Sequence, residues 1–119
     1  MTSFEQAIES AKILSDKKAR NLSVIKIGEV SSLGDYMVLA TGNNSTHVKA
    51  LADELEFQLK GMGVTVHHIE GHRSESWICM DYTDVIVHVF SDEAREYYGL
   101  DRLWQDGESV DLSGYITED

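Results

Sequence analysis

DYTDVIVHVF, residues 81–90, is the stretch that decides the fold. Its last six residues are almost all apolar and rich in valine, which is typical of a strand buried on both faces of a sheet. A shorter apolar run at residues 77–80 precedes it, and a tight four-residue link joins the two. We therefore predict an antiparallel hairpin formed by residues 77–80 and 85–90.

Further strands are expected upstream of this hairpin. Residues 22–27 and 36–41 are short, β-branched or apolar runs bounded by glycines, and residues 64–69 alternate between apolar and polar side chains. These patterns predict three more strands.

Three helices are expected between and around the strands. Apolar residues recur at helical spacing over residues 4–19 and 48–62. Ser3 and Gln6 fit a capping box at the start of the first helix. A third helix begins after the cap residue Ser91 and ends near Gly99.

The predicted element order is α-β-β-α-β-β-β-α, which favours an α/β fold in which a mixed β-sheet carries helices on both faces. We expect a single domain over residues 1–105 and an acidic C-terminal tail over residues 106–119. The tail has five acidic residues and no basic one, so we expect it to be loosely ordered.

The charge of the chain is strongly negative. Twenty-one acidic residues against ten basic ones give a net charge of −11, and residues 60–119 contribute −9 of it (13 acids, 4 bases). Phosphate backbones repel such a chain, so direct nucleic-acid binding is not expected. Two interpretations stay open: the acidity serves solubility alone, or it steers the C-terminal half toward a basic partner.

The compartment is predicted to be cytoplasmic. The only cysteine, Cys79, excludes an internal disulfide and fits a reducing environment. No run approaches the ~20 apolar residues that span a bilayer, so no membrane association is expected.

Histidines and aspartates are the candidates for chemistry. His67, His68 and His72 lie close in sequence, but neighbours on a strand point to opposite faces, and we expect no metal site and no cofactor. Asp81 and Asp84, with His88, could hold Mg²⁺ or transfer protons. Aspartates in turns more often accept hydrogen bonds from nearby backbone amides, so we expect no catalytic residue here.

Aromatic residues are the better candidates for binding. Trp77, Tyr82, Tyr97, Tyr98 and Trp104 all fall in the acidic half. Such side chains anchor protein interfaces because they bury much area at a small cost in entropy. Trp77 is predicted to be a partner contact, whereas core packing and contact both stay open for Phe90 and Trp104.

These features also carry a family resemblance. The residues concerned are Glu70-Gly71, Trp77, residues 81–90, Arg95, Tyr97-Tyr98, Leu100-Asp101 and Leu103-Trp104, with residues 31–38 and 40–42 in the first half. Over about residues 5–105 the chain resembles the Iojap family, the ribosomal silencing factors.

The resemblance implies a nucleotidyltransferase-like fold without enzymatic activity. It implies a translational repressor that binds the large ribosomal subunit through ribosomal protein fourteen, blocks association with the small subunit, and lowers translation when nutrients are limiting. It also implies a homodimer when the protein is free. The implied partner-binding residues are Trp77, Asp81, Tyr82, Asp84, His88, Arg95 and Tyr98.

Two departures from the family pattern and two alternatives remain. Thr83 replaces a glycine in the hairpin turn, where a β-branched residue is expected to resist positive φ, and Asp101 replaces a glutamate. One alternative is an assembly factor of the large subunit that acts at the same site. The other is a nucleotidyltransferase-like enzyme that uses Asp35, Asp81 or Asp84 with Mg²⁺.

Overall fold

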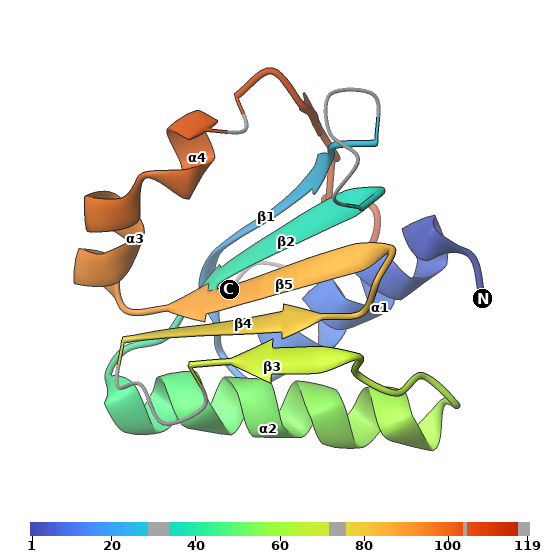
Figure 1. Ribbon diagram of the computed structural model, residues 1–119, viewed down its shortest axis with the longest axis horizontal. Helices are drawn as coiled ribbons and strands as arrows, with labels where there is room; N and C mark the ends of the chain where they lie inside the picture. Colours follow the sequence, from blue (N-terminus) through green and yellow to red (C-terminus); the bar gives the residue numbers. More distant parts are fainter. Residues whose placement is uncertain (29–33, 72–75, 104, 117–119) are drawn as a thin grey trace.

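The computed structural model describes residues 1–28, 34–71, 76–103 and 105–116. The helices are α1 (Ser3–Asp16), α2 (Ser45–Gly61), α3 (Asp92–Tyr98) and α4 (Leu100–Leu103); the strands are β1 (Arg20–Lys26), β2 (Tyr36–Thr41), β3 (His68–Glu70), β4 (Trp77–Asp81), β5 (Val85–Phe90) and β6 (Glu108–Ser109). The strands form one sheet in the order β3-β4-β5-β2-β1-β6 (Figure 1).

The sheet is mixed, as predicted. β5 pairs in parallel with β2, and the other neighbouring strands pair antiparallel. β5 lies in the interior of the sheet and five of its six residues are buried, which confirms that its apolar run is covered on both faces.

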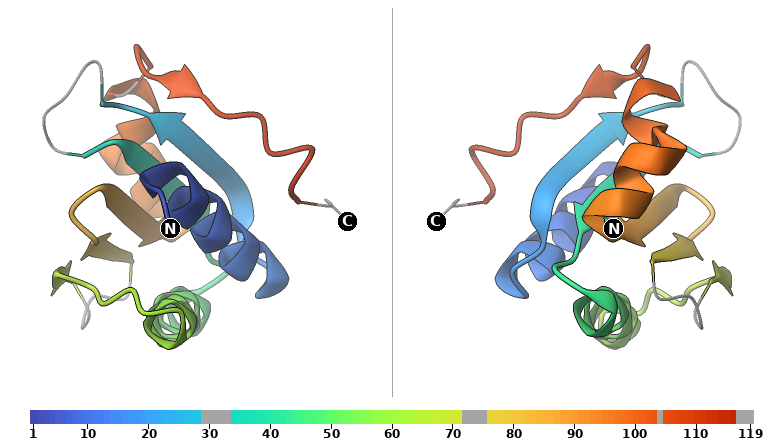
Figure 2. Two further views of the ribbon diagram at one scale, coloured as in Figure 1. Left: turned by 90° about the vertical axis from the view of Figure 1, so that its right-hand side faces the viewer. Right: turned by 90° about the vertical axis from the view of Figure 1, so that its left-hand side faces the viewer.

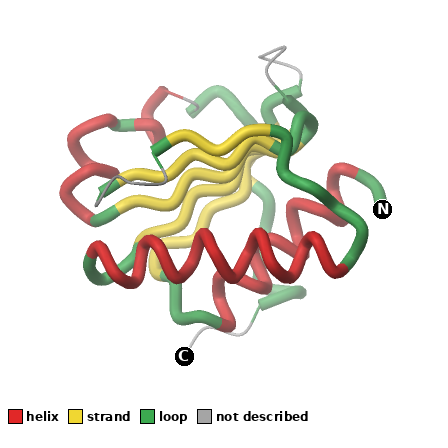
Figure 3. The backbone as a smooth tube through the Cα atoms, turned by 60° about the horizontal axis from the view of Figure 1, so that its bottom comes forward, coloured by secondary structure: helices red, strands yellow, loops and turns green. Residues whose placement is uncertain are grey.

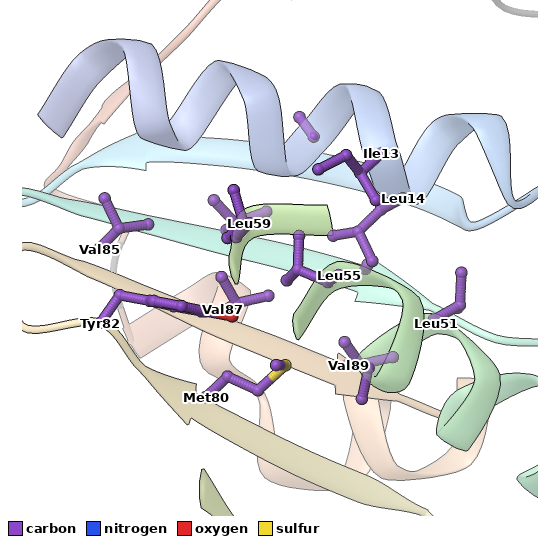
Figure 4. Close-up of a cluster of buried hydrophobic side chains, with 14 of the residues drawn as sticks. Ile13, Leu14, Leu51, Leu55, Leu59, Met80, Tyr82, Val85, Val87 and Val89 are labelled. Carbon is purple, nitrogen blue, oxygen red and sulfur yellow. The ribbon is translucent and has the colours of Figure 1, made fainter. Parts of the chain in front are cut away.

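Helices α1 and α2 cover one face of this sheet (Figures 2 and 3). Leu51, Leu55 and Leu59 recur every four residues, so they form one stripe of α2 that points at the strands (Figure 4). These three side chains are fully buried, and each contributes about 2 kcal/mol of apolar burial to the folded state.

Helices α3 and α4 lie against the other face and cover only part of it (Figure 2). A second cluster there joins Ala94 and Leu100 to strand residues such as Leu39 and Phe90. Within the described residues no helix lies over β3 and β4 on this face, where Trp77 and Cys79 are only half-buried. This leaves a strip of sheet accessible beside α3.

The first helix starts one residue earlier than predicted. Thr2 is the N-cap: its Oγ1 accepts a hydrogen bond from the Glu5 amide (3.1 Å), and its own amide donates to Glu5 Oε1 (2.9 Å). A carboxylate accepts more strongly than the Gln6 amide group would, and Gln6 is buried instead. The helix also ends at Asp16 rather than near residue 19, and the third strand is reduced to His68–Glu70.

The acidic tail is more ordered than predicted over its described part. β6 pairs with β1, and the Val110 amide donates a hydrogen bond to the Val24 carbonyl (2.8 Å). Val110, Leu112 and Ile116 pack against the core cluster. The expectation of loose order was wrong for these residues, because their apolar side chains reach the core. In addition, β6 pairs with β1, whose edge would otherwise expose unpaired backbone groups.

Candidate partner-binding surface

The strip beside α3 carries a group of stacked rings. Trp77 pairs with Phe90 across β4 and β5, so both side chains lie on the α3 face, and their ring centroids are 5.9 Å apart. The ring of Tyr98, from the end of α3, lies 4.3 Å from Trp77, and the ring of Tyr97 lies 5.1 Å from Tyr98. We call Trp77, Tyr97 and Tyr98, with His88 and Phe90 beneath them, the aromatic surface.

Exposure divides this surface into an outer and an inner part. Tyr97 is 82% exposed and Tyr98 is 49% exposed, whereas Phe90 is fully buried and His88 is 8% exposed. Tyr97 and Tyr98 are therefore exposed, Trp77 is half-buried, and Phe90 supports them from below.

His88 holds Trp77 in place. The Trp77 Nε1–H donates a hydrogen bond to His88 Nδ1 (3.0 Å). Burial lowers the pKa of His88 to about 4, so the ring is neutral near pH 7. The predicted contact residue His88 thus lies mostly behind Trp77.

The hairpin turn places two carboxylates at the far end of the same strands. Asp81 Oδ1 accepts a hydrogen bond from the Thr83 amide (2.7 Å), and Asp84 is exposed. Thr83 has a φ of 75°, contrary to the expectation that its branched side chain resists this region. Asp81 lies four positions along β4 from Trp77, which corresponds to about 13 Å.

Tyr82 lies on the opposite face from Trp77. Its side chain belongs to the core cluster under α2 and is 6% exposed (Figure 4). Burial raises the pKa of its phenol, and the hydroxyl has no hydrogen-bond partner among the described residues. The structure therefore separates Tyr82 from the other predicted contact residues.

Arg95 points inward and joins three parts of the fold. Its Nε and Nη2 donate to the Asp101 carboxylate (3.0 and 2.9 Å), and its Nη1 donates to the Asn21 carbonyl and to Thr41 Oγ1 (3.0 Å). The hydrogen bond from Arg95 lowers the pKa of Asp101. With 12% of its side chain exposed, Arg95 ties α3 to β1 and β2.

Of the aspartates that the nucleotidyltransferase alternative would use, Asp35 and Asp84 are joined by a backbone hydrogen bond. The Asp35 amide donates a hydrogen bond to the Asp84 carbonyl (2.8 Å). Among the residues that the structure describes, no three His, Cys, Asp or Glu side chains are grouped to hold a metal ion. His68 contacts Glu70 (3.1 Å), and His72 lies outside the described residues.

The structure brings Trp77 and Tyr98, both predicted as contact residues, together with Phe90, which the sequence left open between core and contact. The register of the hairpin would have settled where Phe90 lies. Trp77 pairs with Phe90 and Cys79 pairs with His88, so these four side chains lie on one face. Trp104, the other open case, lies outside the described residues. Over those described residues, no helix is both long and apolar enough to cross a membrane.

The fold places the protein among small α/β domains with a mixed six-stranded sheet. A family model described as "Ribosomal silencing factor during starvation" matches residues 1–119. The chain is 34% identical over 102 residues to a ribosomal silencing factor of Halalkalibacterium halodurans and 34% identical over 103 residues to that of Bacillus subtilis. These matches cover 86% and 87% of this chain, respectively, and 87% of each relative.

A crystal structure agrees with these matches. A protein from Chromobacterium violaceum superposes with a TM-score of 0.78 at 36% identity, covering 87% of this chain and 83% of that one. The chain therefore belongs to the ribosomal silencing factor family, and the resemblance seen in the sequence is confirmed.

Proposed function

We propose that this protein binds the large ribosomal subunit in the cytoplasm through its ribosomal protein fourteen and sterically blocks association with the small subunit. Translation would thereby fall when nutrients are limiting. Membership of the ribosomal silencing factor family supports the ribosome as partner. The observation that carries the proposal is the aromatic surface, where Tyr97 and Tyr98 are exposed next to Trp77.

The aromatic surface has the composition of an interface centre. Trp77 and Tyr98 present large rings at 4.3 Å from each other, and Phe90 and His88 fix the position of Trp77. Rigid aromatic side chains lose little entropy on binding, so a few of them contribute most of the affinity of many interfaces.

Carboxylates lie on the Trp77 face of the sheet and at the hairpin turn. Glu70 and Asp81 project from β3 and β4 on the Trp77 face, and Asp84 is exposed at the hairpin turn. Together with the charge of −9 on residues 60–119, they favour a partner rich in lysine and arginine. Charge pairing would guide docking, and the rings would supply most of the affinity.

The mechanism requires no chemistry from the protein. A protein bound to the face of the large subunit that meets the small subunit prevents association by volume alone. The relatives are named as silencing factors, and the described carboxylates form no group suited to a metal.

The test is co-sedimentation of the purified protein with isolated large and small subunits over a series of salt concentrations. Asp84→Lys reverses an exposed charge. Asp81→Asn removes a charge but keeps the oxygen that accepts the Thr83 amide. Asp16→Lys is the control, because Asp16 is exposed at the end of α1, which covers the other face.

Binding to the large subunit alone is expected, and it should weaken with salt. Asp84→Lys should weaken the affinity for the large subunit about three- to tenfold, whereas Asp16→Lys should bind nearly as well as the unchanged protein. Absence of large-subunit binding, or unimpeded joining of subunits when the protein is bound, would exclude the proposal.

A second candidate function is assembly of the large subunit. The mouse protein named "Mitochondrial assembly of ribosomal large subunit protein 1" is 28% identical over 95 residues, and the match covers 42% of that protein. Both functions would use the aromatic surface. Accumulation of precursor large subunits in a deletion strain during rapid growth would favour assembly, whereas normal large subunits there would favour silencing.

A further inference from the structure

A pocket of about 940 Å³ lies away from the Trp77 strip, between the end of α1, the start of β1 and the C-terminal segment. Its lining includes Lys18, Arg20, Leu22, Arg95, Leu112 and Ile116. Three of these are cationic, and none of the described lining residues is acidic, in a chain with twenty-one acids and ten bases. Asp92 and Asp101 pair with Arg20 and Arg95 from outside the lining, so among the described lining residues the unpaired charge is that of Lys18.

The backbone at the rim is irregular. Lys18 has a φ of 69° and Asn21 a φ of 50°, both in the left-handed region that side chains other than glycine rarely adopt. The register between β1 and β2 also shifts between Arg20 and Ser23. Strained residues and bulges concentrate at binding sites, where they direct side chains that a regular strand would turn away.

Arg20 is held in a fixed orientation at this rim. Its Nε donates to Asn43 Oδ1 (2.6 Å), and its Nη1 and Nη2 donate to the Asp92 carboxylate (3.3 and 2.6 Å). These bonds use three of the five N–H donors of the guanidinium group, so two can reach a further acceptor. Asp92 itself is not among the lining residues.

The remaining walls have distinct roles. Lys18 is exposed, and it enters no ion pair within the described part of the chain. Arg95 is a wall rather than a ligand donor, because Asn21, Ser23, Thr41 and Asp101 already accept its hydrogen bonds.

We propose that this pocket binds a small phosphate-bearing molecule with an apolar portion. The phosphate oxygens accept hydrogen bonds from the Lys18 ammonium and from the remaining N–H groups of Arg20. Asp92 occupies the Nη1–Nη2 fork of Arg20, so each of these nitrogens keeps one N–H for a further acceptor. The Lys18 ammonium supplies the charge that attracts a phosphate with several acceptor oxygens. The apolar portion lies against Leu22, Leu112 and Ile116, and the volume is within the range of about 300–1,000 Å³ that is usual for small-molecule sites.

Lys18→Gly is the decisive variant. It removes the ammonium group, and it also relieves a positive φ, so the fold should be at least as stable as before. Lys60→Gln changes the net charge equally at the far end of α2 and serves as the control. The probes are pyrophosphate, adenosine triphosphate and adenosine, titrated without Mg²⁺ and followed by calorimetry and backbone-amide NMR.

Pyrophosphate and adenosine triphosphate should bind, adenosine should not, and the shifted amides should cluster at residues 18–23, 43 and 110–116. Lys18→Gly should weaken binding about tenfold, since one charge-assisted hydrogen bond is lost, and Lys60→Gln should leave it unchanged. No binding of either phosphate compound, equal binding by Lys18→Gly, or binding of adenosine alone would overturn the proposal. None of these readouts involves ribosomes, so the result is independent of the function proposed above.

Discussion

The indole Nε1 of Trp77 donates a hydrogen bond of 3.0 Å to Nδ1 of His88. A histidine nitrogen that accepts a hydrogen bond carries no proton, so His88 is neutral with its proton on Nε2. The orientation of the Trp77 ring thus depends on a His88 imidazole that must stay neutral to accept this hydrogen bond. The geometry of the aromatic surface therefore depends on pH.

The first prediction concerns acid stability. The pKa of His88 is lowered from 6.5 to about 4 in the folded state, so between these values the unfolded chain binds a proton that the native protein does not. The corresponding stability is fully present above pH 7 and is lost as the pH falls toward 4, by about 3 kcal/mol in all. Urea unfolding at pH 7.5 and pH 5 measures this loss.

His88→Gln is the comparison for that experiment, because glutamine does not titrate in this range. Its free energy of unfolding should fall less than that of the unchanged protein between pH 7.5 and pH 5. An equal fall in both proteins would assign the loss to other groups.

The second prediction concerns Arg95, which the sequence placed in the partner contact. Arg95→Gln should lower the free energy of unfolding by about 2–3 kcal/mol, because the Asp101 carboxylate and the Asn21 carbonyl lose their donor. Arg102→Gln changes an exposed residue of α4 and should alter the free energy of unfolding by less than about 0.5 kcal/mol. A neutral Arg95→Gln would mean that α3 is held by its apolar contacts alone.

The third prediction concerns the hairpin turn. Thr83→Gly should stabilise the protein by about 1 kcal/mol over Thr83→Ala, because glycine adopts a φ of 75° without a Cβ clash. The midpoint of urea unfolding reports the difference. Both variants keep the backbone amide that Asp81 accepts, so equal midpoints would show that a Cβ at this φ costs no measurable stability.

Sequence patterns predicted the elements well where apolar spacing was continuous, as in β5 and α2. They could not predict the short tail strand β6, because two residues carry no period and their pairing depends on the edge that β1 offers. They also could not separate Tyr82 from Trp77, since the face of each side chain is set by the register of the hairpin. Arg95 was placed in the partner contact by the family resemblance, which does not indicate that Asp101 and residues of β1 and β2 accept its hydrogen bonds.

The last prediction tests the aromatic surface itself. Tyr98→Ala should weaken large-subunit binding at least about tenfold, because it removes a ring 4.3 Å from Trp77 and uncovers one side of that anchor. Phe57→Ala is the matched control: Phe57 is 74% exposed, but it lies on α2, which covers the other face of the sheet. Phe57→Ala should bind as the unchanged protein does, which would exclude a general effect of exposed aromatic area. If instead Phe57→Ala weakened binding and Tyr98→Ala did not, the ribosome would be engaged through α2, and the accessible strip of β4 would need another role.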